Sequence, residues 1–258
     1  MTVYHCTLTL HDNVFFATRE MGILYETEKY LHNWAISYAL FNVDYISQPY
    51  RLQGEAAQKP EYLDASSAQS LLRLNKEKIY VFPAQPLHWS YQVNTFKAAQ
   101  VAYYGRSKQF GDKGADRNYP INYGRAKELA VGSQYRLYIV APENLKIRRW
   151  IRLGKWAAKV KVEAIQIPDS VFSIKSGKYF CEHPLNPLDL PADTRLLLYN
   201  RIVMPPVSLV SQAQLMGDYW ESTGKVWESL QLQFPQLPKR ICLPRGAFYG
   251  ASYVATVS

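Results

Sequence analysis

The sequence predicts an α+β fold with an antiparallel sheet, because strand-like alternation recurs along the chain while helical spacing is confined to a few stretches. In residues 2–10, Tyr4, Cys6, Leu8 and Leu10 fall on one face and mostly polar residues fall on the other. With 258 residues, 48% of them hydrophobic, the chain is long enough for one sizeable core. This length allows one large domain or two small ones.

The other elements follow in order. A helix is expected from about residue 27 to 42, where apolar residues keep helical spacing. Strands are predicted, from the same alternation, at residues 80–82, 89–95, 135–140, 160–167, 195–204 and 253–257. A short helix is expected around Gly217–Leu230, with Trp220 and Trp227 seven residues apart.

The stretch Leu145–Val162 holds seven Lys/Arg residues and two tryptophans but no acid. Gly154 lies in its middle, where a tight turn favours a residue free to take a positive φ. After it, Val160 and Val162 alternate with lysines, which is typical of a strand with one buried and one cationic face. We predict a basic strand-turn-strand at residues 145–167 that binds a nucleic-acid backbone and its bases. A solvated strand face with core tryptophans is the alternative.

Glycines, basic residues and aromatic residues are interleaved in residues 98–134, which is typical of a long loop. We expect this loop to lie within an insert at about residues 83–135. A loop of this length is typically functional or disordered. Aromatic rings offer stacking platforms for bases, and Arg and Lys contact phosphates. The alternative is a surface loop with incidental tyrosines. The candidate DNA or RNA contacts of this thumb are Tyr104, Arg106, Lys108, Lys113, Arg117 and Tyr119.

The charge distribution favours the nucleic-acid interpretation of both windows. Residues 103–161 contain 14 Lys/Arg and 4 Asp/Glu, a net charge of +10, whereas the rest of the chain contains 16 and 17. A charge that served solubility would be spread along the chain, while a concentrated one is typical of a polyanion site.

Enzyme motifs are missing from the sequence: it has no GxSxG, HExxH, GxxxxGK[ST] or dinucleotide-binding fingerprint. A metal-free ribonuclease needs only a general acid or base and cations, which His11, His88 or His183 could supply with nearby lysines. We expect no catalytic residue, no metal and no cofactor.

Three widely spaced cysteines without a CxxC favour reduced thiols and a cytoplasmic protein, and no apolar run reaches the roughly 20 residues that span a membrane.

Three segments carry a family resemblance: HDNVFFATREMGILYETE at 11–28, NYPINYGRAKEL at 118–129 and WIRLGKWAAKVKV at 150–162. They resemble the type I-D member of the Cas-five group of CRISPR-associated proteins, the Csc-one family. The resemblance implies a single domain spanning residues 1–258, with a ferredoxin-like (RRM-like) βαββαβ core and an inserted β-rich thumb. The glycine-rich loop that many members of the superfamily carry near the C-terminus has only a loose counterpart here, Arg245–Gly250.

The resemblance also implies a function. It implies a non-catalytic, RNA-binding subunit of a type I-D surveillance complex (Cascade) that holds the 5′ handle of the CRISPR RNA. The implied partners are the repeated backbone subunit and a large Cas-ten-like subunit. Some relatives in other subtypes cut precursor RNA, so a metal-independent endoribonuclease is the alternative, and contact with target double-stranded DNA near the protospacer-adjacent motif is a third. The candidate RNA-binding residues are Tyr123, Gly124, Arg125, Lys127, Arg148, Arg149, Arg152, Gly154, Lys155, Lys159 and Lys161.

Overall fold

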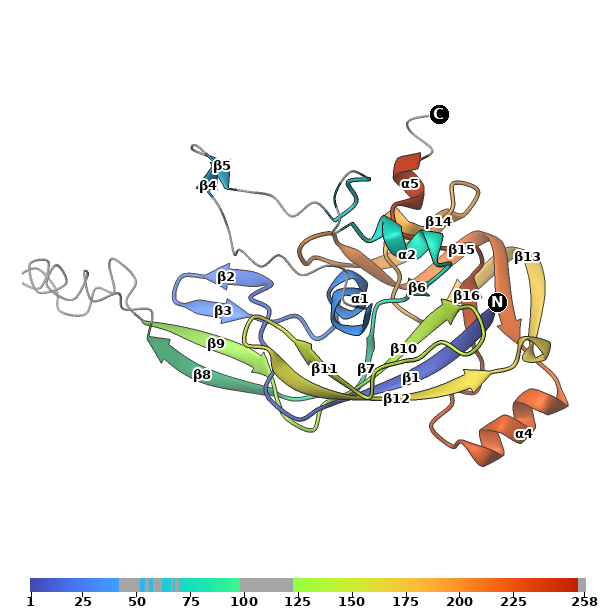
Figure 1. The fold of residues 1–258 in the computed structure, drawn as a ribbon, viewed down its shortest axis with the longest axis horizontal. Coiled ribbons are helices and arrows are strands. Elements are labelled where there is room, and N and C mark those ends of the chain that lie inside the picture. Colours follow the sequence, from blue (N-terminus) through green and yellow to red (C-terminus); the bar gives the residue numbers. More distant parts are fainter. Residues whose placement is uncertain are drawn as a thin grey trace, which may run out of the picture.

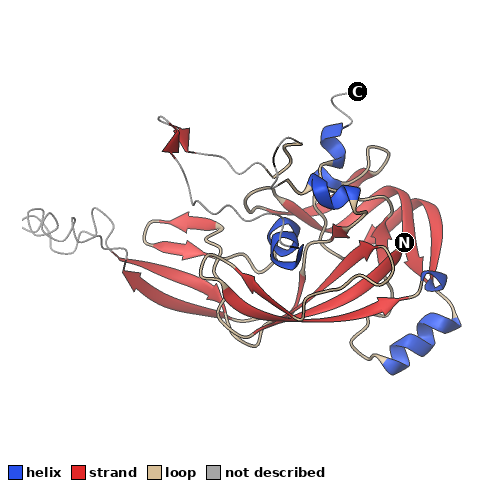
Figure 2. Ribbon diagram, viewed as in Figure 1, coloured by secondary structure: helices blue, strands red, loops and turns tan. Residues whose placement is uncertain are grey.

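A computed structural model of the chain describes residues 1–41, 52–53, 56–57, 62–65, 67, 70–97 and 123–254. Strands dominate these residues, and the helices are short (Figures 1 and 2). The helices are α1 (Asn33–Phe41), α2 (Leu72–Lys76), α4 (Lys225–Gln233) and α5 (Ala251–Val254). Most strands pair antiparallel, so the expected α+β class with antiparallel sheets is confirmed.

The central sheet has the order β11-β12-β1-β10-β6, with β7 also paired to β10. Every pair in it is antiparallel, and β1 lies in the middle, between β12 and β10. Its strands are β1 (Thr2–Leu10), β6 (Tyr80–Val81), β7 (Gln85–His88), β10 (Gln134–Ala141), β11 (Trp150–Leu153) and β12 (Ala158–Ile167). The first and the basic strands predicted from sequence thus become neighbours in one sheet.

Two further sheets flank the central one. The first has the order β13-β15-β14, with β16 paired to β15, and covers one end of the central sheet (Figure 1). Its strands are β13 (Phe172–Cys181), β14 (Arg195–Ile202), β15 (Leu209–Ser222) and β16 (Cys242–Pro244). The second has the order β2-β3-β9-β8 and extends from the opposite end, with β3 and β9 parallel. Its strands are β2 (Arg19–Met21), β3 (Leu24–Glu26), β8 (Tyr91–Lys97) and β9 (Tyr123–Leu129). A small separate hairpin is formed by β4 (Leu52–Gln53) and β5 (Ala56–Ala57).

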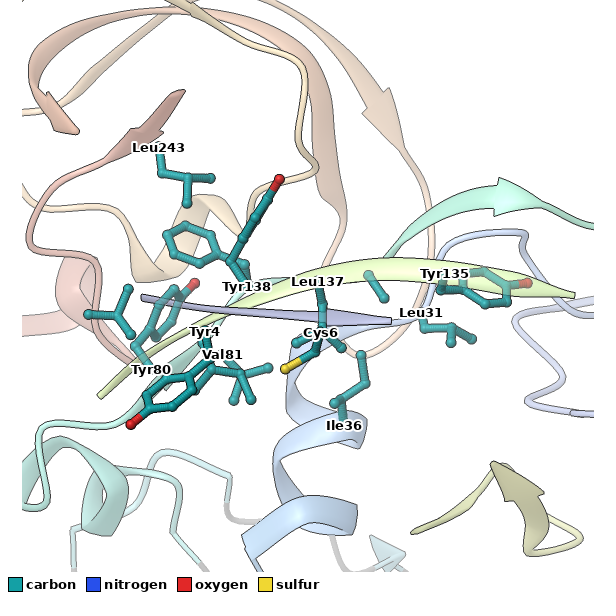
Figure 3. Close-up of a cluster of buried hydrophobic side chains, with 14 of the residues drawn as sticks. Tyr4, Cys6, Leu31, Ile36, Tyr80, Val81, Tyr135, Leu137, Tyr138 and Leu243 are labelled. Atoms are coloured by element: carbon teal, nitrogen blue, oxygen red, sulfur yellow. The ribbon is translucent and has the colours of Figure 1, made fainter. Parts of the chain in front are cut away.

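The main core lies between α1 and one face of the central sheet. Cys6 of β1 and Leu137 of β10 are fully buried there, and Ile36 of α1 points toward them (Figure 3). On the other face, Tyr138 of β10 is buried beneath the sheet that contains β16, whose Leu243 is also fully buried. Among the described residues, the covering sheet extends over only part of this second face, and Gln134 of β10 and Lys159 of β12 are exposed on the remainder.

Four sequence expectations about elements are corrected. The loop expected at residues 98–134 contains the strand β9, which is held by pairing with β8 and β3. The first helix begins at Asn33 and not near residue 27, because the Thr27 and Leu31 N–H groups donate to the carbonyls of Lys127 and Ala84. Residues 217–222 continue β15, so the later helix begins only at Lys225, after Gly224 at φ +87°. Residues 251–254 form a helix and not a strand, while 255–258 lie outside the described residues.

The buried carboxylate Asp189 ties separate parts of the core together. It accepts hydrogen bonds from the Asn33 amide at 2.8 Å, the Tyr80 hydroxyl at 3.2 Å and the Gly250 N–H at 2.9 Å. Burial raises its pKa to about 6, against the lowering effect of these donors. The first residue of α1, the first residue of β6 and the residue before α5 therefore meet at one acceptor.

Replacing Asp189 with alanine is expected to lower the free energy of unfolding by roughly 3–5 kcal/mol, because three donors would be left unpaired in the interior. Asp193→Ala, which removes an exposed carboxylate four residues later, should change it by less than about 0.5 kcal/mol. Urea unfolding of both variants measures the difference. Equal stability of the two would mean that the buried acceptor contributes little.

Three buried histidines predict a loss of stability in acid. Burial lowers the pKa of His5 to about 4 and that of His32 to about 3, and it lowers the pKa of His183 far below its usual range. The unfolded chain therefore binds more protons at these sites between about pH 4 and 6.5, so stability is complete above about pH 6.5 and falls as the pH decreases. Asp189 acts in the opposite direction, because its raised pKa favours the folded state as the pH falls below 6.

Three histidines outweigh one carboxylate, so the free energy of unfolding should decrease from pH 7 to about pH 4.5. Urea unfolding at several pH values tests the sign. His183→Phe, whose ring would keep the contacts with Tyr138 and Phe82, should flatten the decrease. Stability that rose on acidification would contradict this account.

Candidate nucleic-acid interface

The basic strand-turn-strand forms as predicted, with β11 and β12 joined by a turn at residues 154–157. Gly154 has φ +76°, and an added Cβ would lie 2.7 Å from the carbonyl oxygen of Phe15. The same oxygen accepts a hydrogen bond from the Lys155 N–H at 2.7 Å. The segment that follows β1 therefore fixes the position of the cationic turn.

Asp12 holds the second strand of the hairpin. Its carboxylate accepts a hydrogen bond from the Lys159 N–H at 2.8 Å and lies 3.8 Å from Nη1 of Arg152. The Arg152 guanidinium also donates to the Ala157 carbonyl at 3.2 Å. Arg152 and Asp12 are both more than half exposed, so solvent screens this pair and the cation can turn toward an external anion.

The cationic side chains of the hairpin share one face of the central sheet. Trp150 is paired with Lys161 and Arg152 with Lys159, and their side chains point away from α1. Trp150 is 41% exposed, and the Lys159 ammonium lies 4.3 Å from its ring centroid. Lys161 is partly neutralised by Glu163 at 2.8 Å. Arg148, Arg149 and Lys155 are exposed beside this face.

This face continues across three more strands as a polar platform. In one row Lys161 lies beside Thr9, Gln134 and His88, and in the next Glu163 lies beside Thr7, Arg136 and Gln85. The Arg136 guanidinium donates to the Gln85 side chain at 2.8 Å. We call this open surface the hairpin face; it consists of Trp150, Arg152, Lys159, Lys161, Thr7, Thr9, Gln134, Arg136 and Gln85.

Sequence reasoning missed the part of the hairpin face that comes from β1, β7 and β10. Arg136 could have been found, since it interrupts the apolar run from Tyr135 to Ile139 and lies in the basic window. Thr7 and Thr9 carried no signal by themselves, because only the pairing of β1 with β12 places them beside lysines.

An aromatic cluster joins the hairpin turn to the sheet of β2, β3, β9 and β8, which we call the outer sheet. Phe15 stacks on Trp156 with centroids 4.5 Å apart, and Phe96 of β8 meets the edge of Trp156 at 6.0 Å. Gly124 makes room for Phe96, because an added Cβ would lie 2.6 Å from that ring. Of the second predicted window, Gly124 is thus the residue that faces the hairpin.

The other members of that window face away. Because side chains alternate along a strand, Tyr123, Arg125 and Lys127 lie on the opposite face of the outer sheet from Gly124. Lys127 forms an ion pair with Glu26 at 2.9 Å and lies 4.6 Å from the centroid of Tyr91. The two windows are therefore neighbours in space but do not form one continuous cationic surface. The thumb candidates Tyr104, Arg106, Lys108, Lys113, Arg117 and Tyr119 lie outside the described residues.

The three candidate acid–base histidines occupy different environments. His183 is buried between Tyr138 and Phe82, whereas His11 meets the edge of Trp150 at 4.9 Å, and His88 is exposed on β7. Four strand spacings separate His88 from Trp150 in the same row, which is about 19 Å.

The described residues contain no group of three or more His, Cys, Asp or Glu that could hold a metal ion. None of their helices has the length and apolar character needed to span a bilayer.

Fold and site together define a strand-rich α+β protein with an open cationic sheet face. The sequence model of the family described as "Type I-D CRISPR-associated protein Cas5/Csc1" matches residues 1–252. The chain belongs to this family, as the resemblance of its three segments indicated.

Comparison with curated protein sequences gives no match. Among solved structures, a chain of the "Cryo-EM structure of the Type III-B Cmr-beta bound to cognate target RNA and AMPPnP" is similar over 91% of this chain and 90% of its own, with 9% identity and a TM-score of 0.45. The "Crystal structure of a CRISPR protein from Archaeoglobus fulgidus" is similar over 87% of this chain and 97% of its own, with 11% identity and a TM-score of 0.40.

Proposed function

We propose that this protein is a non-catalytic subunit of a type I-D CRISPR surveillance complex that binds the 5′ handle of the CRISPR RNA through the hairpin face. The observation that carries the proposal is the open row of Trp150, Lys161 and Thr9 beside Arg152 and Lys159. Cations there can contact phosphates, and Trp150 offers a ring on which a base can stack. Family membership supplies the CRISPR context.

Single-stranded RNA is the ligand that suits this surface best. The platform is a sheet face without a projecting helix, and unpaired bases can splay onto such a face and stack on its aromatic residues. In the assembled complex the protein would cap the repeated backbone subunit and lie next to the large subunit. Its surface outside the hairpin face would provide those contacts, and target double-stranded DNA near the protospacer-adjacent motif would be a further contact.

The strand order supports a ferredoxin-like origin of the central sheet. β1 and β6 run in the same direction, are connected through α1, and are separated by β10, which is the split βαβ arrangement. A ferredoxin-like core has a second helix before its last strand. Here the connection from β10 to β12 contains β11, which widens the hairpin face.

Co-expression of the full chain with its genomic neighbours tests the proposal. The expected result is co-purification with a short RNA that has one uniform 5′ end. A random RNA population, or no RNA, would contradict the assignment. Incubation of the purified protein with precursor RNA in a chelator should leave the RNA intact; specific products that disappear in His11→Ala or His88→Ala would instead establish the endoribonuclease.

A further inference from the structure

A pocket of about 240 Å³ opens between α1, the segment after Phe15 and the turn that contains Pro205 and Pro206. Its walls are mostly aromatic and apolar. Trp34 and Tyr62 lie with their ring centroids 5.2 Å apart, and Tyr38 and Tyr62 lie 5.9 Å apart. Nothing in the proposed contacts on the hairpin face uses this pocket.

The pocket lies next to the cationic turn of the hairpin. Phe16 lines it, while the preceding residue, Phe15, stacks on Trp156 and accepts the hydrogen bond from Lys155. The helix that supplies Trp34 and Tyr38 packs beside β11 (Figure 1). An RNA strand bound at the turn of residues 154–157 therefore passes close to this pocket.

The pocket is electrically neutral. None of its lining residues is Asp, Glu, Lys or Arg, and burial keeps His32 uncharged at neutral pH. The Thr18 hydroxyl is already engaged, since it donates to the Glu26 carbonyl at 3.1 Å and accepts from the Glu28 N–H at 2.8 Å. What the walls offer is chiefly ring faces and apolar edges.

We propose that this pocket receives one unpaired nucleobase of the RNA strand whose phosphates lie on the cationic turn. The inference rests on the proposed function and adds a second element to it. A base is flat and uncharged, which suits neutral aromatic walls, and its phosphates remain outside, beside Lys155 of the cationic turn. Thr18 is engaged, so any discrimination between bases would come from the polar atoms of the other wall residues, such as His32 and Trp34.

A fluorescent base analogue tests the proposal on the full chain. A single 2-aminopurine is placed at successive positions of an oligouridine strand, where it emits strongly until an aromatic ring stacks on it. One position is expected to be quenched on binding. Ala35→Trp, which fills the pocket without removing a wall, should restore the emission and weaken binding by about 5- to 100-fold. Leu232→Trp, which adds an indole ring at an exposed position of α4 outside the pocket, should behave as the wild type.

The salt dependence separates this inference from the proposed function. Ala35→Trp should leave the salt dependence of binding unchanged, because no phosphate contact is lost. Salt-sensitive RNA binding with no quenched position would overturn the pocket and leave the proposed function standing, whereas no RNA binding at all would overturn both. If Ala35→Trp spared RNA binding but prevented association with the co-expressed subunits, the occupant would be a protein side chain and the inference would be wrong.

Discussion

Replacing Arg152 and Lys155 with glutamate is expected to weaken the binding of single-stranded RNA by roughly 10- to 100-fold at about 0.1 M salt. Both side chains are exposed at the cationic turn, so each substitution removes an attraction to phosphate and adds a repulsion. If each cation contacts one phosphate, the slope of log affinity against log salt should decrease by about 0.7 for each. Binding titrations at several salt concentrations measure both quantities.

A matched control changes the net charge equally on the far sheet. Lys178 of β13 and Arg195 of β14 are exposed and remote from the hairpin face. Lys178→Glu with Arg195→Glu should retain most of the affinity, with a slope close to that of the wild type. If both double variants lost affinity equally, net charge and not the hairpin would account for RNA binding.

Gly154→Ala is the second change with a large expected effect. The residue has φ +76°, which costs an L-residue about 1–2 kcal/mol, and its Cβ would lie 2.7 Å from the Phe15 carbonyl oxygen. The turn would have to move away from that oxygen, which would weaken the hydrogen bond from Lys155 as well. We expect a total loss of about 2–5 kcal/mol in the free energy of unfolding, and a hairpin face that binds RNA less tightly.

Gly132→Ala provides the control for backbone strain alone. Gly132 has φ +84°, but an added Cβ would have nothing within 4 Å. Its substitution should therefore cost only about 1–2 kcal/mol and should not change RNA affinity. Equal losses in the two variants, measured by urea unfolding, would show that the close approach of Phe15 to the turn has no energetic weight.

Local patterns predicted the elements whose side chains alternate. Residues 2–10 and the hairpin around Gly154 form as expected, because one apolar face in each is enough to specify a strand and its orientation. The predicted start of the first helix was wrong because Thr27 and Leu31 are held by backbone hydrogen bonds to residues distant in the sequence, which no local pattern reveals. The predicted start of the later helix was wrong because the spacing of Trp220 and Trp227 suggested one helix. In the structure Trp220 lies on β15 and Trp227 on α4, with Gly224 between them.

The candidate site was predictable as far as its charge, but not as far as its shape. Leu145–Val162 was recognised from composition, yet the neighbours of Lys161 on β1 and β10 follow only from long-range pairing. The environment of Lys127 was mispredicted for the same reason. Its position in the sequence suggested a phosphate contact, whereas strand alternation and Glu26 place it in an ion pair on the other side of the outer sheet.

The stack of Phe15, Trp156 and Phe96 has a mechanical consequence. β8 and β9 form an arm that extends from the body of the protein (Figure 1). Phe96 packs on Gly124 on the face of this arm that contacts Trp156. A tilt of this arm would displace Phe96 and, through its contact with Trp156, the turn of residues 154–157. If a partner subunit contacts these outer strands, we expect its docking to shift Lys155 and thereby to change the proposed RNA binding.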